Sequence, residues 1–206
     1  MLLADTEIRK RCRAIAYSEK PMIDPFVEGV QSNDIISYGL TSAGYDLRMG
    51  LEVLIFKNSF GEAIDPKRFK DQTYLDRMFD KLTYKHMPPD VLNGERLSIT
   101  IPAHGYILAT SYEYLRIPRY LKARCVGKST YARCGLIVNT TPLEPEWEGN
   151  LTIEISNSAP CPSTIYIMEG IAQLEFEQIY GNVETSYKDK KGKYDQQIGV
   201  TPARVL

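Results

Sequence analysis

The stretch that decides the fold is Leu151-Thr152-Ile153-Glu154-Ile155-Ser156-Asn157, in which apolar and polar residues alternate. A period of two is typical of a β-strand with one face toward a core, so Leu151, Ile153 and Ile155 are predicted to be buried. Glu154 then lies on the opposite face. A glutamate there is usually an ordinary solvent-facing residue, but a carboxylate held by a rigid strand is also suited to proton transfer.

A second stretch, residues 171–177, repeats the pattern with Leu174 and Phe176 on one side and Gln173 on the other. From Ile35 onward, short runs rich in Val, Ile, Thr and Tyr are broken by Gly, Pro and Asn about every eight to twelve residues. This texture predicts a mainly β fold. We expect the polar faces of the two strands to line one pocket.

Two helices are predicted outside the β pattern. Asp5 is expected to cap an amphipathic helix within residues 1–20 that runs to about Ser18. In the segment 57–96, Asp65 and Pro66 are typical of a helix start and predict a short inserted helix over residues 66–82. The apolar faces are formed by Ile8, Cys12 and Ile15 in the first helix and by Phe69, Leu75, Met78, Phe79 and Leu82 in the second.

The composition is that of a globular protein with almost no net charge. The chain has 206 residues, of which 43% are hydrophobic, with 25 Lys and Arg against 26 Asp and Glu. The length predicts one domain over residues 1–206, and the charge balance argues against a nucleic-acid binder. No apolar run is long enough to span a membrane and the start lacks the features of a signal peptide, so we expect no membrane partner and a cytoplasmic location.

Cysteine and histidine are too sparse to predict a metal centre. The two histidines, His86 and His104, have no cysteine or carboxylate at ligand spacing, so no zinc site is expected. A nucleophilic thiol would need a general base that no local pattern supplies. The four cysteines form no C-x-x-C pair and are all expected to be buried free thiols: Cys12, Cys125, Cys134 and Cys161.

A cationic stretch precedes a group of carboxylates. Six Lys and Arg residues and no acidic residue lie between Arg116 and Leu143, and four glutamates follow. This arrangement suits a polyphosphate substrate with chemistry at its far end, although charge runs are usually solvated surface. The residues are Arg116, Arg119, Lys122, Arg124, Lys128 and Arg133, followed by Glu144, Glu146, Glu148 and Glu154.

Gly127-Lys128-Ser129 is similar to the end of a Walker A loop, but Lys122 stands where such a loop requires its first glycine. A P-loop is therefore excluded. The Gly-Lys-Ser-Thr turn that remains can still hold phosphate oxygens through backbone N–H groups and hydroxyls. At the other end of the chain, residues 186–206 are polar and cationic and offer little surface to bury, so we expect a tail that is disordered or ordered by a ligand.

Five motifs occur in order: SYGLTSAGYDLR at 37–48, VGKSTYARCG at 126–135, EPEWEG at 144–149, TIEISN at 152–157 and GKYDQQIGVT at 192–201. Together they resemble the dCTP deaminases of the trimeric dUTPase-like superfamily, most closely the proteobacterial and chlamydial type. The resemblance covers about residues 20 to 202 and leaves out much of 57–96. Motifs of this length in this order are highly specific.

The resemblance implies a distorted β-barrel of the dUTPase-like (β-clip) type. It implies a homotrimer, with a hexamer as the alternative, and active sites at the subunit interfaces. The implied substrate is dCTP, the product is dUTP, and dTTP is the implied inhibitor. Mg²⁺ is implied as an ion carried by the triphosphate, with no metal bound by the protein alone and no zinc.

The resemblance also implies roles for single residues. Glu154 matches the general acid and base, and Ser129 and Arg133 match the residues that hold the reacting base and water. Lys128 and Thr130 match phosphate contacts, and Arg133 is expected to keep Glu154 ionised. The full set of implied substrate contacts is Lys128, Ser129, Thr130, Tyr131, Ala132, Arg133, Glu144, Thr152, Ile153, Glu154, Gln173, Tyr187, Lys193 and Gln197.

Some features depart from the family pattern or leave alternatives open. Glu144 stands where many relatives carry Asp beside the sugar, and the segment 57–96 is longer than usual. The zinc-deaminase signature, H-x-E followed by P-C-x-x-C, is absent. The alternatives are a bifunctional enzyme that also cleaves dUTP to dUMP, a pure dUTP diphosphatase, and a nucleotide-sensing module. The tail lacks the Gly-rich, Phe-containing motif of dUTPases, which disfavours the pure diphosphatase.

Overall fold

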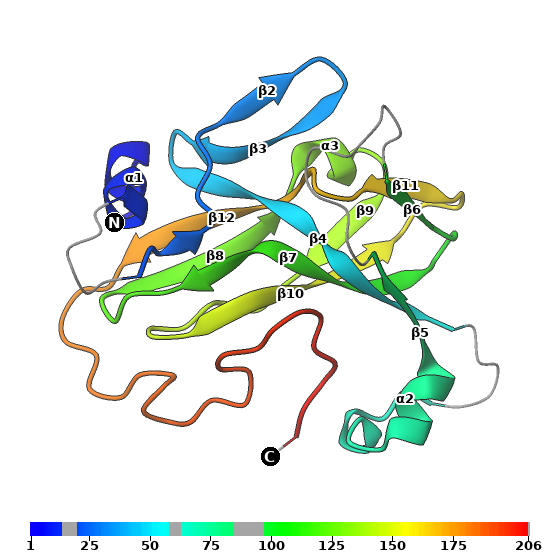
Figure 1. Cartoon of the computed structure of the whole chain (residues 1–206). Coiled ribbons are helices and arrows are strands. Elements are labelled where there is room, and N and C mark those ends of the chain that lie inside the picture. Colours follow the sequence, from blue (N-terminus) through cyan, green and yellow to red (C-terminus); the bar gives the residue numbers. More distant parts are fainter. Residues whose placement is uncertain (14–19, 58–62, 85–96, 206) are drawn as a thin grey trace.

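The computed structural model describes residues 1–13, 20–57, 63–84 and 97–205, and it is built mainly from β-strands with helices beside them, as predicted (Figure 1). The strands are β1 (Ile23–Asp24), β2 (Val30–Ser32), β3 (Ile35–Thr41), β4 (Gly44–Phe56), β5 (Phe79–Thr83), β6 (Ser98–Ile101), β7 (Tyr106–Arg116), β8 (Leu121–Gly127), β9 (Leu136–Asn139), β10 (Glu148–Asn157), β11 (Ser163–Tyr166) and β12 (Gly170–Gln178). The helical segments are α1 (Asp5–Arg13), the 3₁₀ turn η1 (Pro66–Arg68), α2 (Gln72–Met78) and α3 (Ser129–Ala132).

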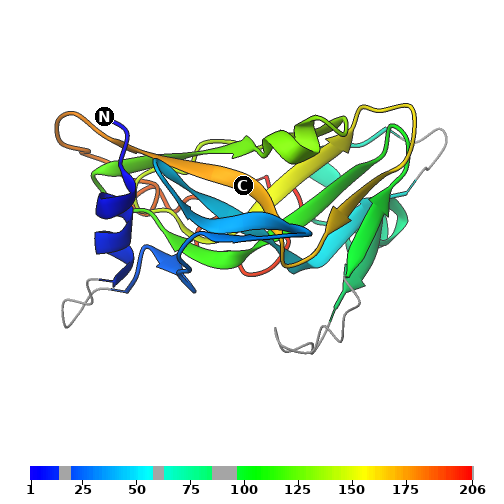
Figure 2. The same ribbon diagram turned by 90° about the horizontal axis from the view of Figure 1, so that it is seen from above.

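Ten of the strands in the described ranges form one sheet, whose main path runs β2-β3-β4-β7-β10-β9. β12 pairs with both β4 and β8, while β6 and β11 form a small separate sheet. The long strand β4 joins two parts of the large sheet, because its first half pairs with β12 and its second half with β7. The sheet therefore curls into a distorted barrel-like half-shell, which the view from above in Figure 2 shows.

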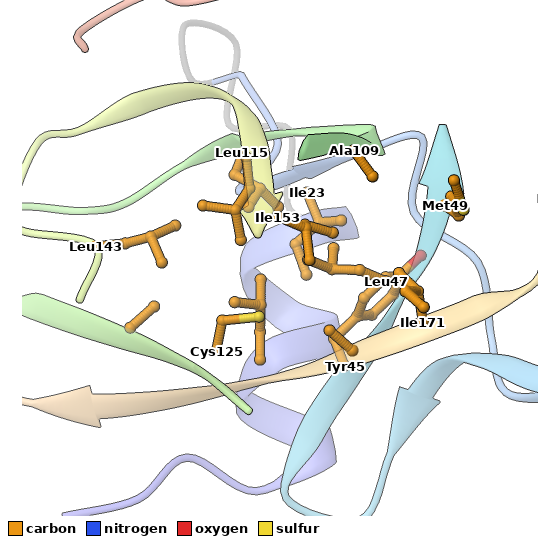
Figure 3. Close-up of a cluster of buried hydrophobic side chains, with 14 of the residues drawn as sticks. Ile23, Tyr45, Leu47, Met49, Ala109, Leu115, Cys125, Leu143, Ile153 and Ile171 are labelled. Carbon is orange, nitrogen blue, oxygen red and sulfur yellow. The ribbon is translucent and has the colours of Figure 1, made fainter. Parts of the chain in front are cut away.

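The alternating strands build the core, as predicted. Ile153 and Ile155 of β10 and Leu174 and Phe176 of β12 are fully buried. Figure 3 shows Ile153 among apolar side chains that come from several strands of the curled sheet. Burying an apolar side chain of this size contributes about 1.5–3 kcal/mol, so the inward faces fix which way the polar faces point.

A second, smaller apolar cluster lies on the outer face of the sheet. Leu54 of β4 and Leu108 of β7 pack there against Tyr74 and Met78 of α2 and against Val200 of the C-terminal tail. The inserted helix and the tail thus cover the part of the sheet that the inner core does not use. The inserted helix and the tail therefore lie next to the candidate site.

The N-terminal helix begins one residue earlier than a cap at Asp5 requires. Asp5 is itself the first helical residue, and the carbonyl of Ala4 accepts the N–H of Ile8 at 3.1 Å. The prediction of Asp5 as the cap is therefore wrong, whereas Ile8 and Cys12 are buried as expected. The predicted continuation through Ile15 to Ser18 lies outside the described residues.

The predicted helix over residues 66–82 is interrupted. Asp65 does accept the N–H of Lys67 at 2.9 Å, but the chain breaks after η1, and Asp71 starts α2 by accepting the N–H of Thr73. From Phe79 the backbone is extended and pairs with the end of β4. The physical reason is that β4 offers an open row of hydrogen-bond partners, which favours an added strand over a further helical turn.

Two of the four cysteines are not buried. Cys12 and Cys125 are buried free thiols, as expected, but Cys134 and Cys161 are exposed. Cys134 lies two residues after the short α3 and Cys161 lies in the connection from β10 to β11, so both belong to surface turns. Among the described helices, none combines the length and the apolar composition that crossing a membrane requires.

Candidate active site

Glu154 is held at the middle of a strand that is paired on both sides. Its register partners are Leu108 of β7 and Asn139 of β9. Because ladder hydrogen bonds fix β10 from two directions, the carboxylate is attached to a rigid position. Its side chain lies on the same face as Thr152, opposite the buried Ile153 and Ile155, as the alternation predicts.

The environment of the Glu154 carboxylate disfavours its charge. Burial raises its pKa from 4.5 to about 7, and the atom Oε2 is shielded from solvent with no hydrogen-bond partner among the described residues. An ionised carboxylate in such a place is costly, and carboxylates with such shifted pKa values gather at functional sites. A pKa near neutrality lets one group both accept and return a proton.

A cavity of about 610 Å³ lies over Glu154. Thr152, Leu108 and Glu154 form its floor, and the loop from Thr141 to Glu144 forms one wall. Three aromatic side chains that were not among the predicted site residues form another wall: Phe56 of β4, Phe69 after η1 and Tyr106 of β7. Tyr106 packs edge-on against Phe56 with ring centroids 5.1 Å apart, and burial together with the nearby Glu154 charge raises its pKa.

The C-terminal tail roofs this cavity and buries more than was predicted. Ser186, Gln197, Val200 and Thr201 are buried, so the expectation of a tail that buries little is wrong. The main chain at Gln197 forms a parallel bridge with Gly149 at the start of β10. Polar backbone groups on β10 provide the partners that the sequence of the tail could not reveal.

Gly149 permits this close approach. Its φ is +148°, and a Cβ at this position would lie 2.8 Å from the carbonyl oxygen of Gln197. The side chain of Gln197 in turn donates to the carbonyl of Asn150 at 2.6 Å. Further along, the N–H of Thr201 donates to Oγ1 of Thr152 at 3.1 Å.

Arg119 anchors the start of the tail, a role that its membership of the cationic stretch did not predict. Its guanidinium donates to the carbonyls of Val183 and Glu184 at 3.1 and 2.9 Å, and to the carboxylates of Asp189 at 2.8 Å and Glu146 at 2.5 Å. A planar group with several donors is suited to gathering such partners. The tail is thus fixed at both ends of its course over β10.

The tail also carries three of the predicted contacts into the pocket, namely Tyr187, Lys193 and Gln197. Tyr187 lies at its wall, and its hydroxyl accepts the N–H of Tyr194 at 3.0 Å. Lys193 lines the same cavity and donates to the carbonyl of Arg204 at 2.7 Å. Of the predicted site residues, the cavity therefore brings together Glu144, Thr152, Glu154, Tyr187, Lys193 and Gln197.

The remaining predicted residues lie elsewhere in the chain. Ser129, Thr130, Ala132 and Arg133 are exposed on or beside α3, none of them in the cavity lining. Ile153 faces the core, so only its backbone is open to a role in binding. The Tyr131 side chain is buried, and its hydroxyl accepts the N–H of Tyr166 at 2.9 Å.

Gln173 and Lys128 form a second polar group around Asp46 of β4. Lys128 forms a short ion pair with the Asp46 carboxylate, and Gln173 donates to the same carboxylate at 3.0 Å. Because β12 lies between β4 and β8 while β10 lies between β7 and β9, the polar faces of β10 and β12 do not meet within one chain. The expected shared pocket is therefore not formed within one chain.

Two electrostatic expectations are also corrected. Arg133 donates to the carbonyl of Ser129 at 3.1 Å rather than pairing with Glu154, so within one chain it does not keep that carboxylate ionised. The cationic stretch does not converge on a phosphate site either. Four of its six members pair with carboxylates instead: Arg116 with Asp24 and Glu148, Arg119 with Glu146, Lys122 with Glu144, and Lys128 with Asp46.

No three His, Cys, Asp or Glu side chains within the described ranges gather as a metal site would require. His104 is exposed, and His86 lies outside those ranges. Structural and catalytic zinc sites use three or four such ligands. The expectation of a zinc-free site stays a prediction.

The raised pKa of Glu154 predicts how its contribution to stability changes with pH. Between about pH 4.5 and 7 the folded chain holds a proton that the unfolded chain has released, so stability falls as pH rises through this window. The loss is on the order of 3 kcal/mol, since one pKa unit corresponds to about 1.4 kcal/mol. The Glu154→Gln variant has no carboxyl group to titrate at this position. Its free energy of unfolding, relative to that of the parent, should therefore increase between pH 5 and 8.

Urea unfolding of the two proteins at equal protein concentration measures this difference. Subtracting the variant from the parent removes the titration of all other groups. A difference that does not vary with pH would mean that a cation already holds Glu154 ionised, and the burial argument would be wrong.

Known proteins are similar to this chain in sequence and in fold. A family model described as dCTP deaminase-like matches residues 2–179. The chain is 45% identical to a dCTP deaminase of Helicobacter hepaticus. The match extends over 205 residues, which are 100% of this chain and 98% of the relative. The chain is 46% identical to a dCTP deaminase of Gluconobacter oxydans over 99% of both chains.

Among solved structures, the chain is similar to the crystal structure of a 2′-deoxycytidine 5′-triphosphate deaminase from Agrobacterium tumefaciens. The TM-score is 0.56 and the identity 18%, over 87% of this chain and 48% of that one. This chain therefore spans about half the length of that protein, and the likeness shows a shared fold only.

Proposed function

The chain belongs to the dCTP deaminase-like family, and from that premise we propose that it hydrolyses the 4-amino group of dCTP to give dUTP and ammonia. Full-length similarity to dCTP deaminases supports this substrate. The observation on which the proposal rests is the buried Glu154 carboxylate, with its pKa near 7, on the floor of a cavity of nucleoside size.

The chemistry needs one group that moves protons in two directions. Water attacks C4 of the cytosine, and its proton must be taken up; a proton must then reach N3, and another the departing amine. One water enters and one ammonia leaves, with no change of oxidation state. Glu154 suits this sequence because its raised pKa makes both protonation states accessible near neutral pH.

The remaining substrate contacts follow from the elements around the cavity. Aromatic side chains on one wall suit a planar base, and Glu144 on the loop opposite suits the sugar. We assign Mg²⁺ to the triphosphate of the substrate, where it would offset phosphate charge, as is usual for this ion. No step is assigned to zinc.

We further propose that a neighbouring subunit completes the site in a homotrimer. The residues that the resemblance assigns to the reacting base and water, Ser129 and Arg133, are exposed on α3 and outside the cavity of their own chain. A cyclic assembly brings such a surface of one subunit to the pocket of the next. Ser129 and Arg133 of the neighbour would then orient the water that Glu154 activates.

Incubation of the pure protein with dCTP and Mg²⁺ tests the proposal. We expect one ammonia per dCTP consumed and dUTP as the nucleotide product, resolved from dUMP by anion exchange. Formation of dUMP with pyrophosphate would establish the bifunctional alternative. No ammonia release from dCTP, with the folded state verified by circular dichroism, would show that the proposed function is wrong.

A further inference from the structure

A second cavity, of about 370 Å³, adjoins the one that holds Glu154. Its lining comes from two segments far apart in sequence, the turn η1 with the residues that follow it and the end of the tail. Phe69, Lys193 and Ala203 line both cavities, so the two lie directly side by side.

The charge of this second cavity is one-sided. Lys67, Lys70, Lys193 and Arg204 line it, and no acidic residue is found among the described residues of its lining. Four like charges around one hollow repel each other, and an anion in the hollow relieves that repulsion.

The neighbouring groups do not neutralise these cations. Lys193 donates to the carbonyl of Arg204 at 2.7 Å, and Arg204 donates to the carbonyl of Lys193 at 3.1 Å, so both are hydrogen-bonded but not ion-paired. Lys67 and Lys70 are exposed, and neither forms an ion pair with any described side chain. The nearest acids in sequence, Asp65 and Asp71, accept the backbone N–H groups of Lys67 and Thr73, and neither forms an ion pair with Lys67 or Lys70.

Lys128, which the resemblance assigns to phosphate, is in a different position. Its ammonium is paired with the buried Asp46 carboxylate, so the two groups together carry no net charge. For a triphosphate that binds across the two cavities, most of the unpaired positive charge of the protein therefore lies at η1 and the tail.

We propose that η1 and the end of the tail form a phosphate subsite, in which Lys67 and Lys70, with Lys193 and Arg204, bind the outer phosphates of the nucleotide. The inference rests on the proposed function in one respect, the identification of the ligand as a deoxycytidine triphosphate. The inserted segment thereby favours the triphosphate over the monophosphate, because its cations attract the charge of the outer phosphates.

The double variant Lys67→Gln/Lys70→Gln tests the subsite without touching the residues around Glu154. The matched control is Lys190→Gln/Lys191→Gln, which removes the same charge from exposed tail residues that line neither cavity. We expect KM for dCTP to rise at least about tenfold in the test variant, since each lost charged hydrogen bond is worth about a factor of ten or more. The kcat should stay within about twofold of the parent, and the control should resemble the parent.

Calorimetric titration with inorganic tripolyphosphate gives a readout that does not depend on turnover. The parent and the control should bind it, and the test variant should bind it at least about tenfold more weakly. Equal KM and equal tripolyphosphate affinity in the parent and test variant would overturn the inference, as would an equal loss in the control. If the parent releases no ammonia from dCTP, the proposed function fails, and the titration still decides whether the anion subsite exists.

Discussion

Glu154→Gln is expected to abolish turnover of dCTP while leaving the fold and nucleotide binding intact. Glutamine keeps the size and hydrogen-bonding shape of the side chain but cannot accept and return a proton. General acid and base assistance is worth about 10²- to 10⁴-fold, and the two proton transfers share this one group, so kcat should fall by at least that much. Binding is measured by the thermal protection that dCTP gives to the variant.

Glu144→Gln is the matched control, because it makes the same chemical change on the loop that lines the same cavity. Glu144 is half-exposed and pairs with Lys122 at 3.6 Å, so its charge is not isolated as that of Glu154 is. Its loss should act on KM and leave kcat close to the parent's. The contrast separates the chemical step from affinity within one pocket.

A Glu154→Gln protein that turned over dCTP within about threefold of the parent would show the mechanism to be wrong, because that change is far below general-base magnitudes. Among the described acidic residues, Glu144 would then be the remaining carboxylate of the cavity. Glu146 is paired with Arg119, and Glu175 lies on β12 away from the cavity, so neither is a substitute.

The inner core and the position of Glu154 were predictable because both depend on local alternation. In β10, buried and outward side chains follow the period of two that the sequence shows. The aromatic wall was not predictable, since Phe56, Phe69 and Tyr106 belong to β4, to the insertion and to β7, and only tertiary packing brings them together. Contacts between residues that are this far apart in sequence leave no local sequence pattern.

The positions of the charged residues in the structure were also not predictable from the sequence. The cationic stretch from Arg116 to Arg133 is visible in the sequence, but strand β8 and the following turns distribute it over several parts of the surface, where carboxylates pair with four of its six members. Four cations that do gather around one cavity are Lys67, Lys70, Lys193 and Arg204, which are scattered in sequence. Net charge along a chain is therefore a poor guide to net charge at a site.

The largest recovery of activity is expected from mixing two inactive variants. Glu154→Gln removes the proton-transfer group, and Arg133→Gln removes the cation on the exposed α3 that is assigned to the neighbouring subunit's site. Each homotrimer should be inactive, because every site in it lacks one of the two groups. In a mixed trimer, one site combines an intact Glu154 with an intact Arg133 from the next subunit.

The expected size of the recovery follows from counting. Random assembly from equal amounts places about three quarters of the trimers in the mixed class, and each mixed trimer has one intact site in three, so activity should return to about one quarter of the parent's. Co-refolding the two variants from denaturant and assaying ammonia release measures it, with each variant refolded alone as the control. If both groups acted within one chain, no mixed trimer would contain an intact site and activity would stay at the level of the separate variants. Recovery near one quarter requires that α3 of one subunit reaches the Glu154 cavity of the next.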